Sequence, residues 1–193
     1  MNDFAFYFDL GWRHIISIDA LDHILFVIVL AALYLLKNWK QVLILVTAFT
    51  IGHSLTLALS VYDLVRINGK WVEFLIPCTI MATAIFNIRQ KSLQPGSLKL
   101  NYFLALIFGL IHGLGFANTI RFMLAKNEKI ALPLFSFNVG LEAGQIIIVT
   151  GILLLSYLFV QVILIKRKWW IWALSSVAFC IALKMAWERW PFE

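Results

Sequence analysis

The chain has 193 residues, of which 62% are hydrophobic and 13% charged, and it carries a formal net charge of +6. An apolar content well above the roughly one half of globular proteins excludes an ordinary soluble domain. The basic residues do not indicate nucleic-acid binding, because they cluster in short connections between apolar runs, where they act as topology signals and lipid contacts. The composition therefore predicts a polytopic membrane protein.

The amino-terminal region differs from a signal peptide. Residues 1–10 contain Asp3 and Asp9 but no Lys or Arg, so the basic region of a signal peptide is missing. The first apolar run is therefore expected to be retained. Cys78 and Cys180 both fall within apolar runs and are expected to be buried free thiols, and neither they nor Lys184 is assigned a role.

Six apolar segments are long enough to cross a bilayer of about 30 Å as helices. They cover residues 15–36, 42–62, 71–88, 102–122, 132–164 and 169–187 of a single integral membrane domain, residues 1–193. Pro77 in the third segment is expected to be accommodated within the helix. The fifth segment exceeds one straight crossing and is expected to tilt or to project. The pattern predicts an all-α bundle of six transmembrane helices.

The charge pattern of the loops predicts the orientation of the chain. The loops after the first, third and fifth segments hold basic residues and no acids. The opposite membrane side, which includes both termini, holds as many basic residues, but several of these lie within helix ends. The positive-inside rule therefore favours these three loops as cytoplasmic and both termini as external. The residues of these loops are Lys37, Lys40, Arg89, Lys91, Lys99, Lys166, Arg167 and Lys168.

Ionisable residues inside the apolar segments predict a functional site. Asp22 and His23 lie in the first segment, His53 in the second, His112 in the fourth and Glu142 in the fifth. Counted along each helix to its end on one membrane side, the three histidines and Glu142 lie nine or ten residues deep, which corresponds to about 14 Å. Buried ionisable groups are unfavourable in hydrocarbon unless they face a cavity, a partner or an ion. One polar site near the middle of the membrane is therefore expected.

The chemistry of these residues favours a divalent transition metal. Imidazoles together with carboxylates suit nickel, cobalt or zinc, whereas magnesium and calcium prefer oxygen ligands alone. Other polar residues on the same helix faces could orient the ligands. Asp19 and His14 lie closer to the surface and are expected at the entrance. The supporting and entrance residues are His14, Asp19, Thr50, Ser54, Asn138 and Gln145.

A short internal repeat links two of the segments. Residues 49–58 and 108–117 share the pattern Phe-x-x-x-His-x-Leu-x-(Leu/Phe)-Ala. They lie on the second and fourth segments, which are predicted to cross in the same direction. A parallel duplication of a helix pair would produce this repeat, as in some transporters, and so could chance in a chain rich in Leu and Phe.

Several ordered motifs resemble the HupE/UreJ family of small bacterial membrane proteins. The resemblance implies a nickel or cobalt permease of the bacterial inner membrane, with Asp22, His23, His53, His112 and Glu142 at the family's histidine and acid positions. No His-rich tract of the kind that some nickel carriers use is present. The motifs, within residues 11–145, are Gly11-x-x-His14-Ile15, Asp22-His23-Ile-Leu-Phe26, Phe49-Thr-x-x-His53-Ser54-Leu-Thr56-Leu57, Phe108-Gly109-Leu-x-His112-Gly-x-Gly115-Phe116-Ala117 and Phe137-Asn138-x-Gly140-x-Glu142-x-Gly144-Gln145.

Two function classes remain open on the sequence alone. In a permease, Asp22 and the histidines would hold a dehydrated cation, Glu142 would balance charge or exchange a proton, and rocking helix pairs would alternate access. In a metal-dependent intramembrane hydrolase, the same residues would hold zinc or a similar ion, with Glu142 or Asp22 as general base, Ser54 as nucleophile or oxyanion donor, and a lipid or peptide bond as substrate. The family resemblance favours transport. The metal, the transport direction and the oligomeric state stay open.

Overall fold

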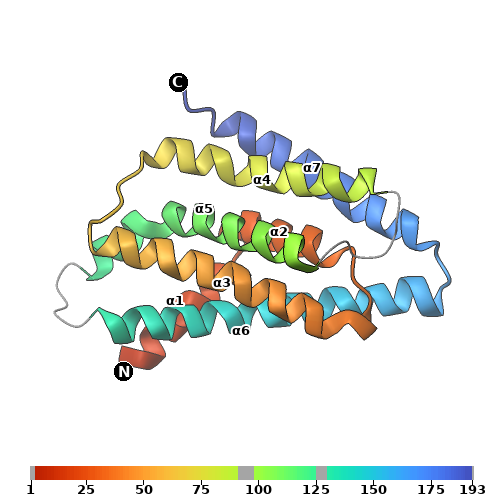
Figure 1. The fold of residues 1–193 in the computed structure, drawn as a ribbon, viewed down its shortest axis with the longest axis horizontal. Coiled ribbons are helices and arrows are strands. Elements are labelled where there is room, and N and C mark those ends of the chain that lie inside the picture. Colours follow the sequence, from red (N-terminus) through yellow and green to blue (C-terminus); the bar gives the residue numbers. More distant parts are fainter. Residues whose placement is uncertain (1–2, 91–97, 125–129, 193) are drawn as a thin grey trace.

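The computed structural model describes residues 3–90, 98–124 and 130–192, and these ranges are almost entirely helical, with no strand (Figure 1). Seven α-helices carry the fold. Three shorter pieces, η1 (Ile18–Ala20), η2 (Leu36–Asn38) and the π-helical η3 (Tyr157–Val162), join or extend them. The α-helices are α1 (Asp3–Ile16), α2 (Leu21–Ala31), α3 (Trp39–Val61), α4 (Gly69–Arg89), α5 (Leu98–Leu124), α6 (Ala131–Ser156) and α7 (Arg167–Glu188).

The helical membrane architecture is confirmed, but the count of six spans is only partly supported. Four stretches are long and apolar enough to cross a membrane: Leu36–Val61, Gly69–Arg89, Ala131–Val162 and Arg167–Glu188. The bent pair of α1 and α2 makes a fifth if it is counted as one span. Within the described part of α5 the apolar stretch is shorter, Asn101–Phe116. The protein is thus a multi-pass membrane protein with four or five clear spans among its described residues.

The first predicted span, residues 15–36, is not one straight helix. The chain forms α1 and α2, which meet at an angle of 68° across residues 17–20, and α2 ends at Ala31. A break of this kind leaves helix-end N–H and C=O groups inside the protein, where other groups must satisfy them. The prediction missed the break because residues 15–36 are mostly apolar. Hydropathy measures the length of an apolar run and does not detect a bend within it.

Two predictions about the later helices agree with the structure. Pro77 lies within the continuous helix α4. The long fifth segment continues beyond α6 into η3, and together they span Ala131–Val162. Cys78 and Cys180 are free, as predicted, but neither is fully buried, since Cys78 is half-buried and Cys180 is exposed. In a membrane protein an exposed apolar residue is compatible with contact to lipid.

Two pairs of parallel helices pack at unusually short distances. In the α3–α5 pair, a Cβ atom added to Gly109 would collide with the carbonyl oxygen of Phe49. In the α1–α6 pair, a Cβ atom added to Gly140 would collide with the carbonyl oxygen of Phe8. Figure 1 shows that α3 and α5 run in the same direction, as the internal repeat predicts. Small residues allow such backbone contact in membranes, where packing rather than hydrophobic burial drives helix association.

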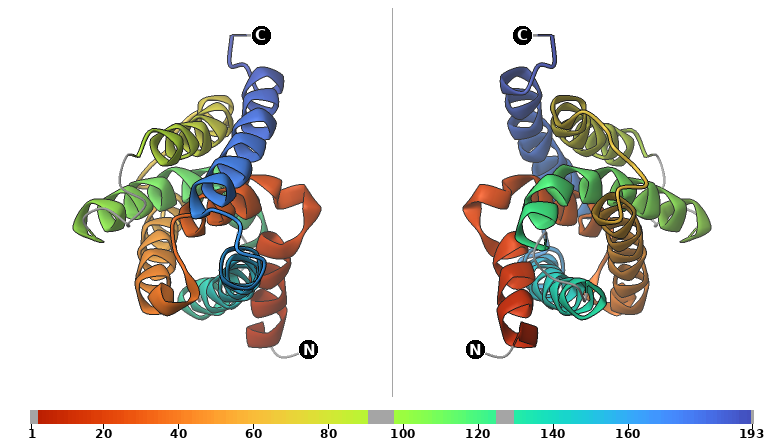
Figure 2. Two further views of the ribbon diagram at one scale, coloured as in Figure 1. Left: turned by 90° about the vertical axis from the view of Figure 1, so that its right-hand side faces the viewer. Right: turned by 90° about the vertical axis from the view of Figure 1, so that its left-hand side faces the viewer.

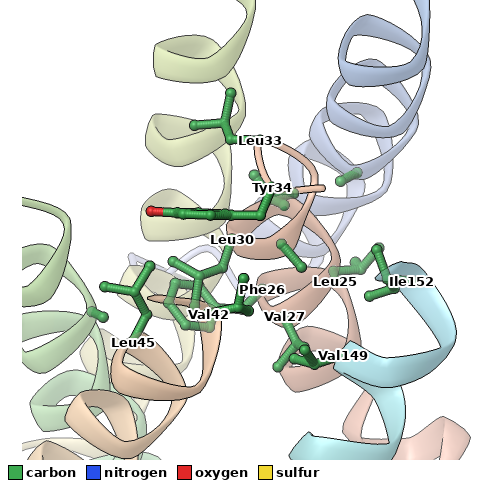
Figure 3. Close-up of a cluster of buried hydrophobic side chains, with 14 of the residues drawn as sticks. Leu25, Phe26, Val27, Leu30, Leu33, Tyr34, Val42, Leu45, Val149 and Ile152 are labelled. Carbon is green, nitrogen blue, oxygen red and sulfur yellow. The ribbon is translucent and has the colours of Figure 1, made fainter. Parts of the chain in front are cut away.

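The short helix α2 lies at the centre of the bundle, surrounded by the longer helices (Figure 2). Its apolar side chains contact α3 on one side and α6 on the other, as Figure 3 shows for Val42 and Val149. Both ends of α2 therefore lie among other helices. At its carboxyl end, Asn87 of α4 donates a hydrogen bond to the carbonyl of Val29 (2.8 Å) and Arg167 donates one to the carbonyl of Leu33 (2.5 Å). These side chains satisfy carbonyls that the early end of the helix leaves free.

Candidate metal site

The four histidines of the sequence meet around the amino-terminal end of α2. His14 comes from α1, His23 from α2, His53 from α3 and His112 from α5. The ring of His23 is central, with its centroid 4.7 Å from that of His14, 5.0 Å from that of His112 and 6.1 Å from that of His53. We refer to these four residues as the histidine cluster.

Five ring nitrogens of the cluster are buried without a hydrogen-bond partner in the protein. This holds for Nε2 of His14, His23 and His112 and for both ring nitrogens of His53. One ring nitrogen from each of His14, His23 and His53 lies within 4.8 Å of the other two. Two nitrogens bound to one ion at about 2.1 Å lie no more than about 4.2 Å apart, so small side-chain adjustments would close this set around a metal. Buried polar atoms normally have hydrogen-bond partners, so ring nitrogens without a partner in the protein are free to bind a ligand.

Two of the imidazoles are held in a defined tautomer. Nδ1 of His112 donates a hydrogen bond to the carbonyl oxygen of Phe108 (2.8 Å), which can only accept. Nδ1 of His23 lies 2.9 Å from Oδ1 of Asp22. A proton on Nδ1 leaves the lone pair on Nε2, the atom that faces the cluster without a partner. Carboxylates and backbone carbonyls orient metal-binding histidines in the same way in other proteins.

Asp22 links the cluster to the far end of the chain. Its Oδ2 atom accepts a hydrogen bond from Nη1 of Arg189 at 3.1 Å, and both side chains are largely covered. Its Oδ1 atom also accepts the backbone N–H of His23, at 2.9 Å. A carboxylate in the first turn of a helix is stabilised by the free N–H groups there. Both carboxylate oxygens of Asp22 therefore have partners, and the carboxylate contacts His23 at Nδ1, not at the unpartnered Nε2.

A cavity of about 500 Å³ connects the cluster with the surface. His14, His23 and His112 line its inner part, and the exposed residues Arg13 and Glu73 line its outer part. Its mouth lies near the start of α4 and the end of α7, at the end of the bundle where both termini lie (Figure 1). A hydrated ion could approach the histidines from this end.

Aromatic rings pack on the other side of the cluster. Phe26 stacks on Phe49 with centroids 5.0 Å apart and meets Phe108 edge to face at 5.3 Å. Phe26 and Phe49 also contact the ring of His112, at 5.4 and 5.2 Å. Phe108 in turn lines a second, mostly apolar cavity of about 180 Å³. We call Phe26, Phe49 and Phe108 the aromatic barrier.

The structure does not bring Glu142 together with the histidine cluster. The Glu142 carboxylate accepts a hydrogen bond from Thr47 (2.6 Å), and the close group of His14, His23 and His53 includes neither it nor His112, whose ring nevertheless lies 5.0 Å from that of His23. One turn further along both helices, Thr50 donates a hydrogen bond to the side-chain oxygen of Gln145 at 2.8 Å. These two contacts join α3 to α6. A count of residues along each helix predicts depth, but it does not specify which way a side chain faces.

The remaining predicted residues have local partners or lie apart. Ser54 donates its hydroxyl hydrogen to the carbonyl of Thr50 (2.7 Å), one turn back in its own helix. Asn138 lies beside His53 and donates to the carbonyl of Leu134 at 2.8 Å. The side chain of Asp19 lies outside the described residues. Lys184 forms an exposed pair with Glu188, away from the cavity.

Two residues have roles at this site that depth counting did not reveal. The sequence predicts His14 at the entrance, yet its ring lies against His23 because the chain bends between α1 and α2. Arg189 lies in the cavity beside Asp22, which the sequence does not indicate. The Gly11-x-x-His14 motif was a signal for His14, since glycine allows α1 to pack closely on α6. For Arg189 no comparable signal exists, because it lies 167 positions from its partner Asp22.

Comparison with known proteins gives one match. The family model described as HupE / UreJ protein matches residues 1–189, which is nearly the whole chain. No curated protein and no solved structure matches it. The match covers every residue of the histidine cluster, Asp22 and Arg189.

Proposed function

Because the chain belongs to the HupE/UreJ family, we propose that it is a permease for a divalent transition-metal ion of the nickel or cobalt type. That family is associated with nickel and cobalt transport. The transported ion is the cargo, and the histidine cluster is its binding site. The observation that supports this proposal most strongly is the set of buried, unpartnered imidazole nitrogens at the inner end of an open cavity.

The donor atoms support this class of ion. Imidazole nitrogen binds nickel, cobalt and zinc well, whereas magnesium and calcium require oxygen ligands. Asp22 would raise the basicity of His23 through the hydrogen bond to Nδ1. In this proposal the ligands are His14, His23, His53 and His112, while Glu142 stabilises the contact between α3 and α6.

The surroundings of the cluster support transport with access from one side at a time. The cavity leads from the histidines to the end of the bundle that holds both termini, and the aromatic barrier closes the opposite direction. Release to the other side requires these rings to move, as alternating access does in other transporters. We place the cavity mouth on the external face of the bacterial inner membrane, because the loops at the opposite end carry basic residues without acids.

The hydrolase alternative has less support. Its candidate nucleophile, Ser54, donates its hydrogen to a backbone carbonyl rather than to a base. Of its two candidate bases, Glu142 bonds to Thr47, and Asp22 pairs with His23 and Arg189. A nucleophile needs a base within hydrogen-bond reach, and the hydroxyl of Ser54 bonds to neither carboxylate.

A binding and uptake experiment tests the proposal. The full chain in detergent is titrated with Co²⁺, whose visible absorption changes when nitrogen ligands replace water, and then assayed for Ni²⁺ and Co²⁺ uptake in proteoliposomes. We expect saturable, exchangeable binding and uptake, with both lost in His53→Leu and His112→Leu and kept in Ser54→Ala. Mg²⁺ serves as the control ion.

Two outcomes would contradict the proposal. If both histidine variants bind and transport like the unsubstituted chain, the cluster is not the site. If the purified protein keeps one equivalent of metal through dialysis against a chelator and shows no uptake, the ion is a resident cofactor and the hydrolase alternative gains support.

A further inference from the structure

We propose that Arg189 is a tethered cation that opposes the incoming metal ion at the Asp22–His23 pair and thereby keeps metal binding weak and reversible. The inference rests on the proposed permease function and adds a residue that sets the affinity of its site. Arg189 follows directly after α7, which ends at Glu188. It lines the same cavity as His23 and His112.

The first step of the argument is the position of the guanidinium group. Nη1 of Arg189 lies 3.1 Å from Oδ2 of Asp22, while Oδ1 of the same carboxylate lies 2.9 Å from Nδ1 of His23. Arg189, Asp22 and His23 therefore form a chain of three groups that ends at the unpartnered Nε2 of His23. The guanidinium stays charged at all physiological pH values.

The second step is the effect of this positive charge on a metal ion. A hydrogen bond from Arg189 draws electron density from the Asp22 carboxylate, which then polarises the His23 imidazole less. A less basic imidazole is a weaker ligand, and such outer partners change metal affinity by about 10- to 100-fold in known sites. The charge also repels a divalent cation directly, and this repulsion is strong where water is scarce. Both effects act in the same direction.

The third step is the need for release. A permease must let its cargo go, whereas a cluster of four imidazoles with an ionised carboxylate behind one of them could hold a transition metal too tightly for turnover. A mobile counter-ion would diffuse away, but a side chain attached to the chain is always present near the site. Arg189 therefore supplies a constant opposing charge that a metal must overcome to bind.

The Lys184–Glu188 pair on the same helix gives a matched control. Its atoms are 3.5 Å apart, and both side chains are mainly exposed. Removal of the Lys184 charge changes the net charge by the same amount as removal of the Arg189 charge, but leaves Asp22 and its partners in place. An effect found only at position 189 is thus local to the site.

The experiment measures Co²⁺ affinity and uptake for Arg189→Gln in the full chain. We expect affinity to rise by roughly tenfold and the maximal uptake rate to fall, because release becomes slower. Arg189→Lys, which keeps the charge, should stay close to the unsubstituted protein, and Lys184→Gln should match it. In an Asp22→Asn background the Arg189→Gln change should give a smaller gain in affinity, because the path through the carboxylate to His23 is lost and only the direct repulsion of the metal ion remains. If the glutamine variant does not fold, Arg189→Met is a second neutral replacement of similar length.

The outcomes separate this inference from the proposed function. If the unsubstituted chain binds Co²⁺ through its histidines but Arg189→Gln binds with equal or lower affinity, only the role of Arg189 is refuted. Equal tightening by Lys184→Gln would also refute it, since the effect would then be a general one of charge. If the unsubstituted chain binds no Co²⁺, both proposals fail together.

Discussion

The two ends of α2 lie among buried polar groups that are organised in opposite ways. At the carboxyl end, Asn87 donates to the carbonyl of Val29, and nearby Asn101 donates to the hydroxyl of Tyr34 at 2.9 Å. At the amino end, the histidine nitrogens that face one another have no partner. The two ends are on opposite sides of the aromatic barrier.

The difference separates polar residues that stabilise the fold from those proposed to bind a ligand. A buried amide with a hydrogen-bonded partner contributes to stability, and its loss leaves a carbonyl unsatisfied. A buried imidazole without a partner lowers stability and persists because of a function. The helix α2 is thus anchored at its carboxyl end and presents the histidine cluster, the proposed metal site, at its amino end.

The largest effect is expected from a change that separates two helices of the histidine cluster. Gly109→Ala places a methyl group against the backbone of Phe49 and must separate α3 from α5, which moves His53 and His112. We expect a loss of more than about 4 kcal/mol of stability, or no folded protein, measured by size-exclusion chromatography and thermal unfolding. Gly151→Ala is the control, because a Cβ atom there would meet nothing within 4 Å. A normal profile for Gly109→Ala would contradict the close packing.

His53→Leu should separate binding from stability at the amino end. The imidazole is fully buried, and neither of its nitrogens has a hydrogen-bond partner. Leucine keeps a similar volume, so we expect the melting temperature of the metal-free protein to be unchanged or higher. Metal affinity, measured by Co²⁺ titration, should fall by roughly 100-fold or more. A strongly destabilised variant with normal affinity would reverse the assignment of the two ends.

Asn87→Leu should give the opposite result at the carboxyl end. The substitution leaves the carbonyl of Val29 without its donor, which lowers the free energy of unfolding by about 1–3 kcal/mol. Chemical denaturation in detergent would measure the loss. Cobalt affinity should change by less than about twofold, because the Asn87 side chain does not belong to the histidine cluster. Thr150→Val, at an exposed hydroxyl bonded within its own helix, is the control.

The smallest effect is expected at Glu142. Its carboxylate bonds to Thr47, so Glu142→Gln can keep that contact through its amide oxygen. We expect cobalt affinity to stay within about twofold and stability within about 0.6 kcal/mol, the average value for a polar contact between membrane helices. Thr47→Val, which removes the other partner, should give a similar small loss of stability. A tenfold loss of affinity in Glu142→Gln would bring this residue back into the metal site.

The amino-acid sequence by itself determined the class of protein and the shared depth of three of the histidines. Long apolar runs broken by charged loops specify membrane helices, because a chain in hydrocarbon must satisfy its own backbone hydrogen bonds. Helix geometry then allowed the depths of His23, His53 and His112 to be counted, and these three residues do lie together in the fold. These features depend on local spacing, which can be read along one helix at a time.

Only the tertiary structure decided which helix faces meet. The bend between α1 and α2 brought His14 into the cluster, and packing between α3 and α6 turned Glu142 towards Thr47. Arg189 reaches Asp22 only because the end of α7 lies over the start of α2. Depth along a helix follows from residue number, but rotation about the helix axis is set by contacts with other helices, such as the backbone contact at Gly109.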